Sequence, residues 1–301
     1  MTAFSVKQNL LDGSEFNLLL QGLSNLKHKE KQFSTEIEKQ KEVYKLIDLD
    51  LSIIGPIQTI ANDLGKDAIR QLTGWEGKLI SLLELDGFGG YAPLHSMSTN
   101  GFLGSHVDHT YADDGRLIHV GNTIFYAIPK WEESWGGRTI LFDRNGVKNT
   151  LEVTPQPNAL FAFTHDCESF HGVSRITCPD SVYRTTIYMD YYILATDLKQ
   201  FTILFNKTTK DEYFHSKYLT TFLPVVIENE KYIWCSIFSR EFFGYFRNYV
   251  GYLRAKRIQK NKGGTNYPDL RYIILNSIGY IIDMGIYCRQ KLTKVLAIFY
   301  R

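Results

Sequence analysis

The sequence predicts an α+β protein whose core is mainly β and is flanked by helices. Within residues 76–197, short apolar or alternating runs recur between Gly, Pro, Asn and Asp residues, as in a β-sandwich or barrel. Before this core, apolar residues recur at helical spacing. We therefore expect an N-terminal helical flank over 1–75 that packs on the core, the core itself, and a mixed, mainly helical C-terminal extension over 198–301.

Two helices are expected in the N-terminal flank. The first covers 33–49, where Thr35 and Glu38 have capping-box spacing and the apolar residues fall broadly on one face. The second covers 56–72, because Pro56 suits the first turn of a helix and apolar residues follow at helical intervals.

Strands are expected where short apolar runs lie between turn residues. Six segments have this character, which indicates a core built from many short strands. They are KLISLLEL (78–85), NTIFYAIP (122–129), RTILFD (138–143), NTLEVTP (149–155), NALFAFT (158–164) and RTTIYMDYYI (184–193).

Composition excludes several classes of protein. The 34 basic residues nearly balance the 32 acidic ones, so no nucleic-acid partner is expected. The four cysteines lack CxxC spacing and are expected to be free thiols in a reducing compartment. The first residues lack a secretory pattern, and no apolar run reaches the length of a membrane span. A cytoplasmic protein is the expectation.

The segment GSHVDHTYADDG, residues 104–115, suggests a metal site. In a strand, residues two apart point to the same side, so His106 and Asp108 can face one ion. Iron(II) enzymes that activate dioxygen bind the metal through two histidines and one carboxylate, leaving the opposite positions open. The third ligand could be His119, His165 or His171. We favour His171, which begins the alternating run HGVSRI, because ligands mounted on strands are held more rigidly than ligands on loops.

Arg184 supports this interpretation. It opens the run RTTIYMDYY, thirteen positions after His171, which leaves room for one hairpin return. Its guanidinium stays charged at neutral pH and matches a carboxylate through two parallel hydrogen bonds. Such a group could hold the far carboxylate of a 2-oxo diacid whose other end chelates iron.

From Leu72–Trp75 to Tyr188–Tyr192, the sequence resembles the Fe(II)- and 2-oxoglutarate-dependent dioxygenases, in particular the prolyl-4-hydroxylase-like branch. This span is about 120 of the 301 residues. It rests on GFLGSHVDH, TIFYAIPKW, EESWGGRTILFD, the Pro-x-Pro-Asn before LFAF, SFHGV and RTTIYMDYY, in the order of the family.

The resemblance implies a double-stranded β-helix of the jelly-roll or cupin type. It implies that His106, Asp108 and His171 bind Fe(II) and that Arg184 anchors the far carboxylate of 2-oxoglutarate. The expected reaction hydroxylates an unactivated C–H bond, converts 2-oxoglutarate to succinate and CO2, and is supported by ascorbate. The substrate class it implies is a prolyl or peptidyl group, a free amino acid or a secondary metabolite.

Further co-substrate contacts follow only from the resemblance. Tyr126 occupies the position of a tyrosine that aids the carboxylate anchor, and Thr139 and Val173 occupy positions that line the pocket. The sequence also departs from the family. Ser96 replaces a tyrosine about ten residues before the first ligand, by ungapped counting. Tyr-Ala-Ile, from Tyr126, replaces Tyr-Leu-Asn after the central strand.

Two other functions are consistent with parts of the sequence. A metal-dependent hydrolase could use HVDH with His109 as a ligand, but the corresponding zinc signature needs a histidine where Gly104 stands. In the oxygenase interpretation, His109 instead faces the substrate pocket or solvent. A non-catalytic binding module on the same fold is the other alternative, against which the intact ligand set argues.

The C-terminal extension offers two further features. A basic cluster at 254–262 is either the solvated end of a helix or a surface for an anionic partner. It comprises Arg254, Lys256, Arg257, Lys260 and Lys262. The tail YIILNSIGYIIDMGIYC is interrupted by charges, so burial or a homodimer interface fits it better than a membrane span.

Overall fold

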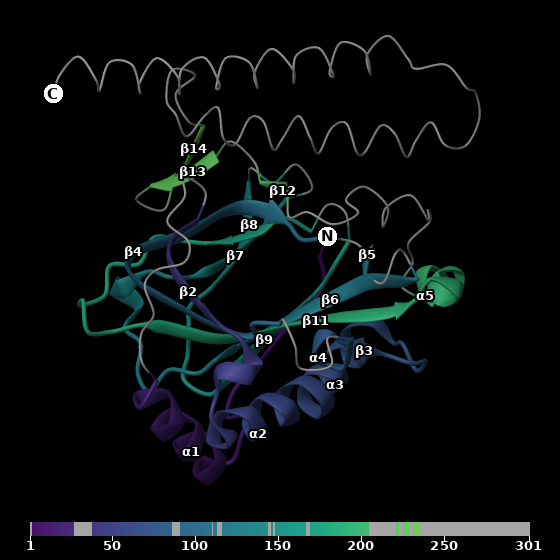
Figure 1. Cartoon of the computed structure of the whole chain (residues 1–301). Helices are drawn as coiled ribbons and strands as arrows, with labels where there is room; N and C mark the ends of the chain where they lie inside the picture. Colours follow the sequence, from purple (N-terminus) through teal and green to yellow (C-terminus); the bar gives the residue numbers. More distant parts are fainter. Residues whose placement is uncertain are drawn as a thin grey trace, which may run out of the picture.

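One 12-stranded antiparallel sheet forms the core of the molecule, and it curls so that its two halves, named here the first and second sheets, face each other and share one long strand (Figure 1). Every paired strand of the described residues is antiparallel to its neighbour. The computed structural model describes residues 2–26, 38–85, 91–109, 111–112, 116–143, 146, 148–166, 169–204, 221–222, 225–228 and 231–234.

Strand β4 (Leu94–Val107) joins the two sheets. Its first residues pair with β11 (Arg184–Leu194), from Leu94↔Ile187 to Met97↔Arg184. Its last residues pair with β10 (His171–Val173), where His106 lies opposite His171. Asn100, with a φ of 63°, adopts the left-handed conformation between these two stretches. The strand therefore changes partners at this point and brings His106 into the second sheet.

The remaining strands complete the two sheets. In the first sheet, β11 is followed by β6 (Leu117–Tyr126), β9 (Ala159–Thr164) and β1 (Phe4–Lys7). In the second, β10 is followed by β7 (Thr139–Phe142) and β8 (Asn149–Val153). This topology is a double-stranded β-helix, and the expected fold class is confirmed. Three strands add to its edges: β2 (Glu38–Tyr44) along β4, β3 (Ile80–Ser81) on β11 and β5 (Tyr111–Ala112) on β6.

Helices cover the face of the first sheet that points away from the second sheet (Figure 1). They are α1 (Gly13–Ser24), α2 (Leu51–Thr59), a π-helical turn at Ile60–Leu64 and α3 (Gly65–Thr73). Side chains alternate along β11, so Ile187, Met189 and Tyr191 pack in the core beneath the helices. Arg184, Thr186, Tyr188 and Asp190 face the space between the sheets.

The expectation of a helix over 33–49 is wrong for the residues of this segment that the structure describes, because residues 38–44 form strand β2. Its register along β4 runs from Glu38↔Leu103 to Tyr44↔Leu94, with one shift between Lys39 and Lys41. Local spacing was compatible with a helix, but hydrogen bonding to the edge of β4 outweighed that weak preference. Together with β1, this strand means that segment 1–75 supplies strands as well as helices, and its boundary with the core stays a prediction.

The second expected helix is present but begins at Leu51, so Pro56 lies inside it rather than in its first turn. A proline normally disfavours a helical residue before it, because its ring contacts the Cβ of that residue. Gly55 has no Cβ, which relieves this contact. The run KLISLLEL also differs from expectation: only Ile80–Ser81 is a strand, and α4 (Leu82–Leu85) is helical.

The described part of the C-terminal extension begins with α5 (Leu198–Leu204). Strand β12 (Thr221–Phe222) then pairs with β4 at Val107 and His106, and β13 (Val225–Glu228) pairs with β14 (Lys231–Trp234). The basic cluster at 254–262 and the proposed dimer surface lie outside the described residues. Among the described helices, none is both long and apolar enough to cross a membrane. Cys178 is a buried free thiol; the other three cysteines are not described.

The helices approach the sheet very closely at Gly65. A Cβ added there would lie 1.9 Å from the Tyr191 hydroxyl oxygen, which donates a hydrogen bond to the carbonyl of Ala61. We expect Gly65→Ala to lower the free energy of unfolding by about 2–3 kcal/mol, because the buried tyrosine must move and break this bond. Chemical denaturation measures the change. Gly13→Ala at the exposed start of α1, where nothing lies within 4 Å, should change stability by less than about 1 kcal/mol.

Candidate metal centre and anion pocket

His106, Asp108 and His171 come together between the two sheets, although Asp108 and His171 are 63 positions apart in the sequence. One ligand atom from each of these buried residues lies within 4.8 Å of the other two. The Nε2 atom of His106 is 3.7 Å from Asp108 Oδ1, and the Nε2 atom of His171 is 3.3 Å from Asp108 Oδ2. The pairing of β10 with β4 sets this convergence, because it places the two histidines opposite each other.

Backbone carbonyls fix the orientation of both imidazoles. His106 Nδ1 lies 2.8 Å from the Gly104 carbonyl oxygen, and His171 Nδ1 lies 3.1 Å from that of Ser169. Each Nδ1–H can donate to its carbonyl, which leaves the Nε2 lone pair directed at the carboxylate. Metal-binding histidines commonly have this arrangement. The donor set and its orientation therefore fit a divalent iron ion.

The three groups also have protonation states that suit metal binding. Burial, together with the adjacent His171, lowers the pKa of His106 to about 3. Burial would raise the pKa of Asp108, but His171 and His106 hold it well below its usual value. Burial opposes protonation of His171, yet the Asp108 carboxylate raises its pKa. Asp108 is thus ionised and His106 neutral at pH 7, so neither has to lose a proton before it binds an ion.

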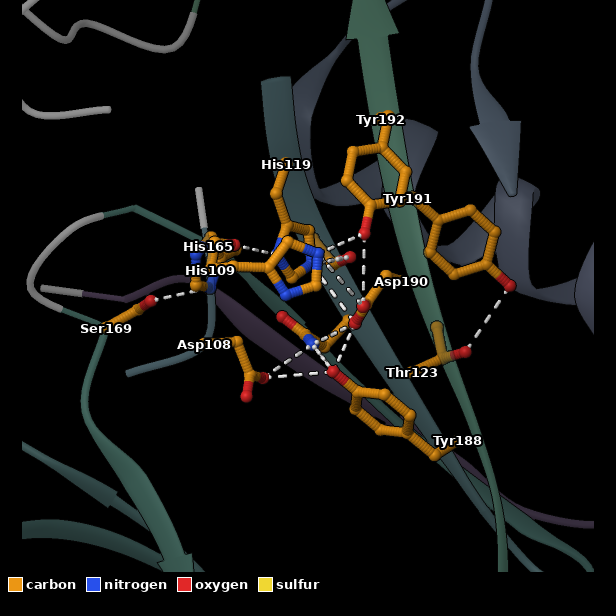
Figure 2. A network of polar contacts seen from close by, with 12 residues as sticks. Asp108, His109, His119, Thr123, His165, Ser169, Tyr188, Asp190, Tyr191 and Tyr192 are labelled. Carbon is orange, nitrogen blue, oxygen red and sulfur yellow. Dashed lines mark hydrogen bonds and ion pairs between the residues drawn. The ribbon is translucent and has the colours of Figure 1, made fainter. Parts of the chain in front are cut away.

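Polar side chains of the first sheet donate hydrogen bonds to the Asp108 carboxylate. Asn122 Nδ2 lies 3.3 Å and the Tyr188 hydroxyl 3.0 Å from Asp108 Oδ2. Both groups also hydrogen-bond to Asp190, the next inward-facing residue along β11 after Tyr188 (Figure 2). This network connects Asp108 to a second buried carboxylate.

A cavity of about 290 Å³ opens in front of the triad. Both sheets and strand β2 contribute to its walls. Six of the seven site residues predicted from the sequence line the cavity, and the seventh, Tyr126, contacts Thr139 in its wall. Its lining includes Lys41, His95, Met97, Leu103, His106, Asp108, His109, Ile124, Thr139, His171, Val173, Arg184, Thr186, Tyr188 and Asp190.

Arg184 lies at the end of this cavity nearest Thr139 and Tyr126. Its Nε donates to the Gly137 carbonyl at 2.7 Å, and one terminal nitrogen donates to Thr139 Oγ1 at 2.8 Å. The hydroxyl of Tyr126 lies 2.8 Å from the same Oγ1 atom, and the guanidinium carbon is 5.3 Å from the centre of the Tyr126 ring. Val173 pairs with Thr139 across β10 and β7 and lines the cavity. The four residues expected to contact the co-substrate are therefore neighbours.

The charge of Arg184 is buried, and no carboxylate within the described ranges neutralises it. The residue is 3% exposed, and no carboxylate of the described chain forms an ion pair with it. An unpaired buried charge costs several kcal/mol, roughly, unless a bound counter-ion offsets it. The guanidinium is thus arranged to receive a carboxylate from a ligand in the cavity.

The other histidine candidates do not join the triad. His119 and His165 stack on each other with ring centres 3.8 Å apart, and His119 forms a separate group with His109 and Asp190. The hydrolase alternative therefore loses its additional ligand, because His109 contacts Tyr192 and not the triad. The sequence could not exclude His119 and His165, since all three candidates flank strands.

Several cavity residues were not predicted from the sequence, among them His95, Met97, Lys41 and Tyr188. His95 and Met97 line the cavity, whereas Ser96 between them lines a different hollow and contacts Thr185 at 3.0 Å. The side chain of Ser96, which stands where the family has a tyrosine, thus faces away from the candidate metal centre. Lys41 reaches the cavity from β2, which had been expected to be a helix. Tyr188 could have been found from its position four residues after Arg184 on the same face of an expected strand.

Residues 92–190 match the family model described as the 2OG-Fe(II) oxygenase superfamily. This segment runs from just before β4 to Asp190 in β11 and contains the triad and Arg184. The comparison with curated proteins gave no match.

Several solved structures are similar to this chain. A prolyl hydroxylase from Trichoplax adhaerens, in complex with a hypoxia inducible factor oxygen degradation domain peptide fragment, is 16% identical over 67% of this chain and 86% of its own, with a TM-score of 0.46. A Pseudomonas putida prolyl-4-hydroxylase is 16% identical over 64% and 93%, with a TM-score of 0.40. HygX from Streptomyces hygroscopicus, with nickel, 2-oxoglutarate and hygromycin B bound, is 12% identical over 64% and 84%, with a TM-score of 0.44.

Proposed function

We propose that this chain, whose residues 92–190 match the model of the 2OG-Fe(II) oxygenase superfamily, is a member of that superfamily and hydroxylates an unactivated C–H bond of an organic substrate. Iron and 2-oxoglutarate are the proposed cofactor and co-substrate. The proposed substrate is a prolyl or peptidyl group, a free amino acid or a secondary metabolite.

The buried guanidinium of Arg184 carries this proposal. It lies in the same cavity as the two histidines and the carboxylate, and no carboxylate of the described residues neutralises it. Hydrolysis by a metal-bound water does not by itself require a buried cation in the same cavity. A ligand with a carboxylate at one end and a metal-chelating 2-oxo acid at the other fits both groups at once.

The residues have distinct proposed roles. His106, Asp108 and His171 would hold the iron, while Arg184 and its neighbour Thr139 would fix the far carboxylate of 2-oxoglutarate. Val173 contributes an apolar wall that excludes water, which strengthens the ionic contact in the pocket. When bound, iron and 2-oxoglutarate supply the oxidising chemistry, in which O2 delivers one oxygen atom to the substrate and the other to succinate as CO2 is lost.

The test is a measurement of succinate release. The purified full-length chain is loaded with Fe(II) without oxygen, supplied with 2-oxoglutarate and ascorbate, and then exposed to air. We expect slow succinate formation that needs both iron and 2-oxoglutarate and that rises when a substrate is present. A screen of prolyl peptides, amino acids and small metabolites then identifies the class that increases the rate. An iron-loaded, folded chain that binds no 2-oxoglutarate and forms no succinate would instead support a non-catalytic binding module.

A further inference from the structure

A second group of metal-ligating side chains lies beside the first. His109 Nε2, His119 Nε2 and the Asp190 carboxylate are all within 4.8 Å of one another. His119 Nε2 is 3.3 Å from Asp190 Oδ1, and His109 Nε2 is 4.0 Å from Asp190 Oδ2. The three side chains come from different places in the fold: just after β4, from β6 and from β11 (Figure 2). Their spacing is similar to that of the triad.

A bulge aims His119 toward this point. Along β6, Asn122 and Ile124 face the space between the sheets, and simple alternation would turn His119 toward the helices. The register of β6 with β11 shifts between Tyr191 and Tyr192, so Gly121 lies opposite Tyr191 but His119 lies opposite Tyr192. Bulges commonly redirect a side chain next to a functional site. Here the bulge places His119 beside Asp190.

Both ring nitrogens of His119 face oxygen atoms that accept hydrogen bonds. Nδ1 lies 2.9 Å from the His109 carbonyl oxygen and can donate its hydrogen there. Nε2 lies 3.1 Å from the Gly121 carbonyl oxygen and 3.3 Å from the Asp190 carboxylate. A neutral imidazole would then direct its remaining lone pair at two oxygen atoms. That arrangement needs a cation at Nε2, which is either a proton or a metal ion.

Asp190 is a buried carboxylate that needs a counter-charge. It is 1% exposed, and no lysine or arginine of the described ranges forms an ion pair with it. Its donors are the amide of Asn122 at 2.8 Å and the hydroxyls of Tyr188 and Tyr192. Asn122 and Tyr188 also donate hydrogen bonds to Asp108, so the two carboxylates share these donors. One ion at the triad would therefore leave the charge of Asp190 without a cation of its own.

We propose that His109, His119 and Asp190 bind a second divalent transition-metal ion, separate from the iron site. Two imidazoles and one carboxylate are a ligand set for zinc, cobalt, manganese or iron. Bonds of about 2.0–2.2 Å to such an ion place neighbouring ligand atoms roughly 3–4 Å apart, which is close to the spacing of this group.

The surroundings of the group suit an ion. His109 Nε2 now lies 2.7 Å from the Tyr192 hydroxyl. That hydroxyl is also 3.2 Å from Asp190 Oδ2, so it can donate to the carboxylate while His109 binds the ion. The His109 carbonyl already orients His119, as partners outside the ligand set commonly do in metal sites. The side chain of His109 is 28% exposed and lines the cavity together with Asp190, which gives an ion a path of entry.

Counting bound cobalt tests the proposal independently of activity. The full-length chain is stripped of metal with a chelator, equilibrated with excess Co(II) without oxygen and desalted, and cobalt per chain is measured by mass spectrometry. Two ions per chain are expected for the natural sequence. His109→Ala should retain one, and the double variant His106→Ala/His171→Ala should also retain one. His95→Ala removes a histidine of the same cavity outside both groups and should retain two.

The pattern of losses distinguishes the two sites. One ion in the natural chain and none in the double variant would overturn the second site and leave a protonated His119 paired with Asp190. Two ions retained by His109→Ala would also overturn it. A different outcome is one ion in the natural chain, one in the double variant and none in His109→Ala. That result would support the second site and count against the iron site. Circular dichroism of each variant confirms folding, and the visible spectrum of cobalt in the double variant should disappear when His109→Ala is added.

Discussion

Arg184→Met should weaken the binding of 2-oxoglutarate by about 100-fold or more while leaving metal affinity almost unchanged. Truncating one partner of a buried charged pair costs roughly 2–5 kcal/mol, because the ligand carboxylate would enter a dry pocket without its cation. Methionine keeps much of the side-chain volume, although it cannot donate the hydrogen bonds that Arg184 gives to the Gly137 carbonyl and to Thr139. Titration calorimetry without oxygen measures both affinities: Mn(II) is titrated into the metal-free chain, and 2-oxoglutarate into the Mn(II)-loaded chain.

Arg138→Met provides the matched control for this variant. Arg138 lies on the approach to β7, near Arg184 in the fold, but it pairs with Glu133 and Glu152 at 3.6 and 3.8 Å. Surface ion pairs of this kind contribute little. We expect the affinity for 2-oxoglutarate to stay within about twofold of the natural chain. Equal affinities in the Arg184 and Arg138 variants would remove Arg184 from its proposed role.

His171→Ala should abolish succinate formation and lower metal affinity at the triad by more than about 100-fold. Loss of a partner outside the ligand set typically costs about 10- to 100-fold, and loss of a ligand itself should cost more. The change also leaves Asp108 with only one imidazole beside it. Metal affinity is measured by competition with a chelator whose colour reports free metal, and succinate is measured by chromatography.

His165→Ala is the control that separates the histidine candidates. His165 was an alternative third ligand in the sequence, and it is as deeply buried as His171, at 1% against 4% exposure. Its Nδ1 lies 3.1 Å from Ser169 Oγ, and its Nε2 has no hydrogen-bond partner among the described residues. We expect this variant to bind metal at the triad within a few fold of the natural chain, because the described hydrogen bond of His165 is to Ser169 and not to a ligand, and the larger losses arise at partners bonded to ligands. A loss of metal there equal to that of His171→Ala would contradict the assignment.

Local patterns in the sequence were sufficient for much of the core. The run RTTIYMDYY correctly predicted a strand that begins at Arg184, and the structure shows Tyr188 and Asp190 on the same face of it. The spacing of His106 and Asp108 placed both side chains toward one point, as observed. These features depend on neighbours a few residues apart, which the sequence displays directly.

Features that depend on distant pairing were not determined in the same way. Segment 38–44 has spacing compatible with a helix, yet it forms β2 because the edge of β4 offers it hydrogen-bond partners. The position at 96 was expected to correspond to a co-substrate contact, but the pairing of β4 with β11 turns its side chain away from the cavity. His119 points toward Asp190 only because of a bulge between β6 and β11.

The sequence by itself determined the β-rich class, the first two members of the candidate ligand set and the cation at the far end of the pocket. Periodicity and residue chemistry are local, and both can be read along the chain. The sequence favoured His171 as the third member, whereas only the tertiary structure brought it beside the other two and gathered His109 and His119 around Asp190. The physical reason is that strand register, set by hydrogen bonds between segments far apart in sequence, determines which side chains share a face.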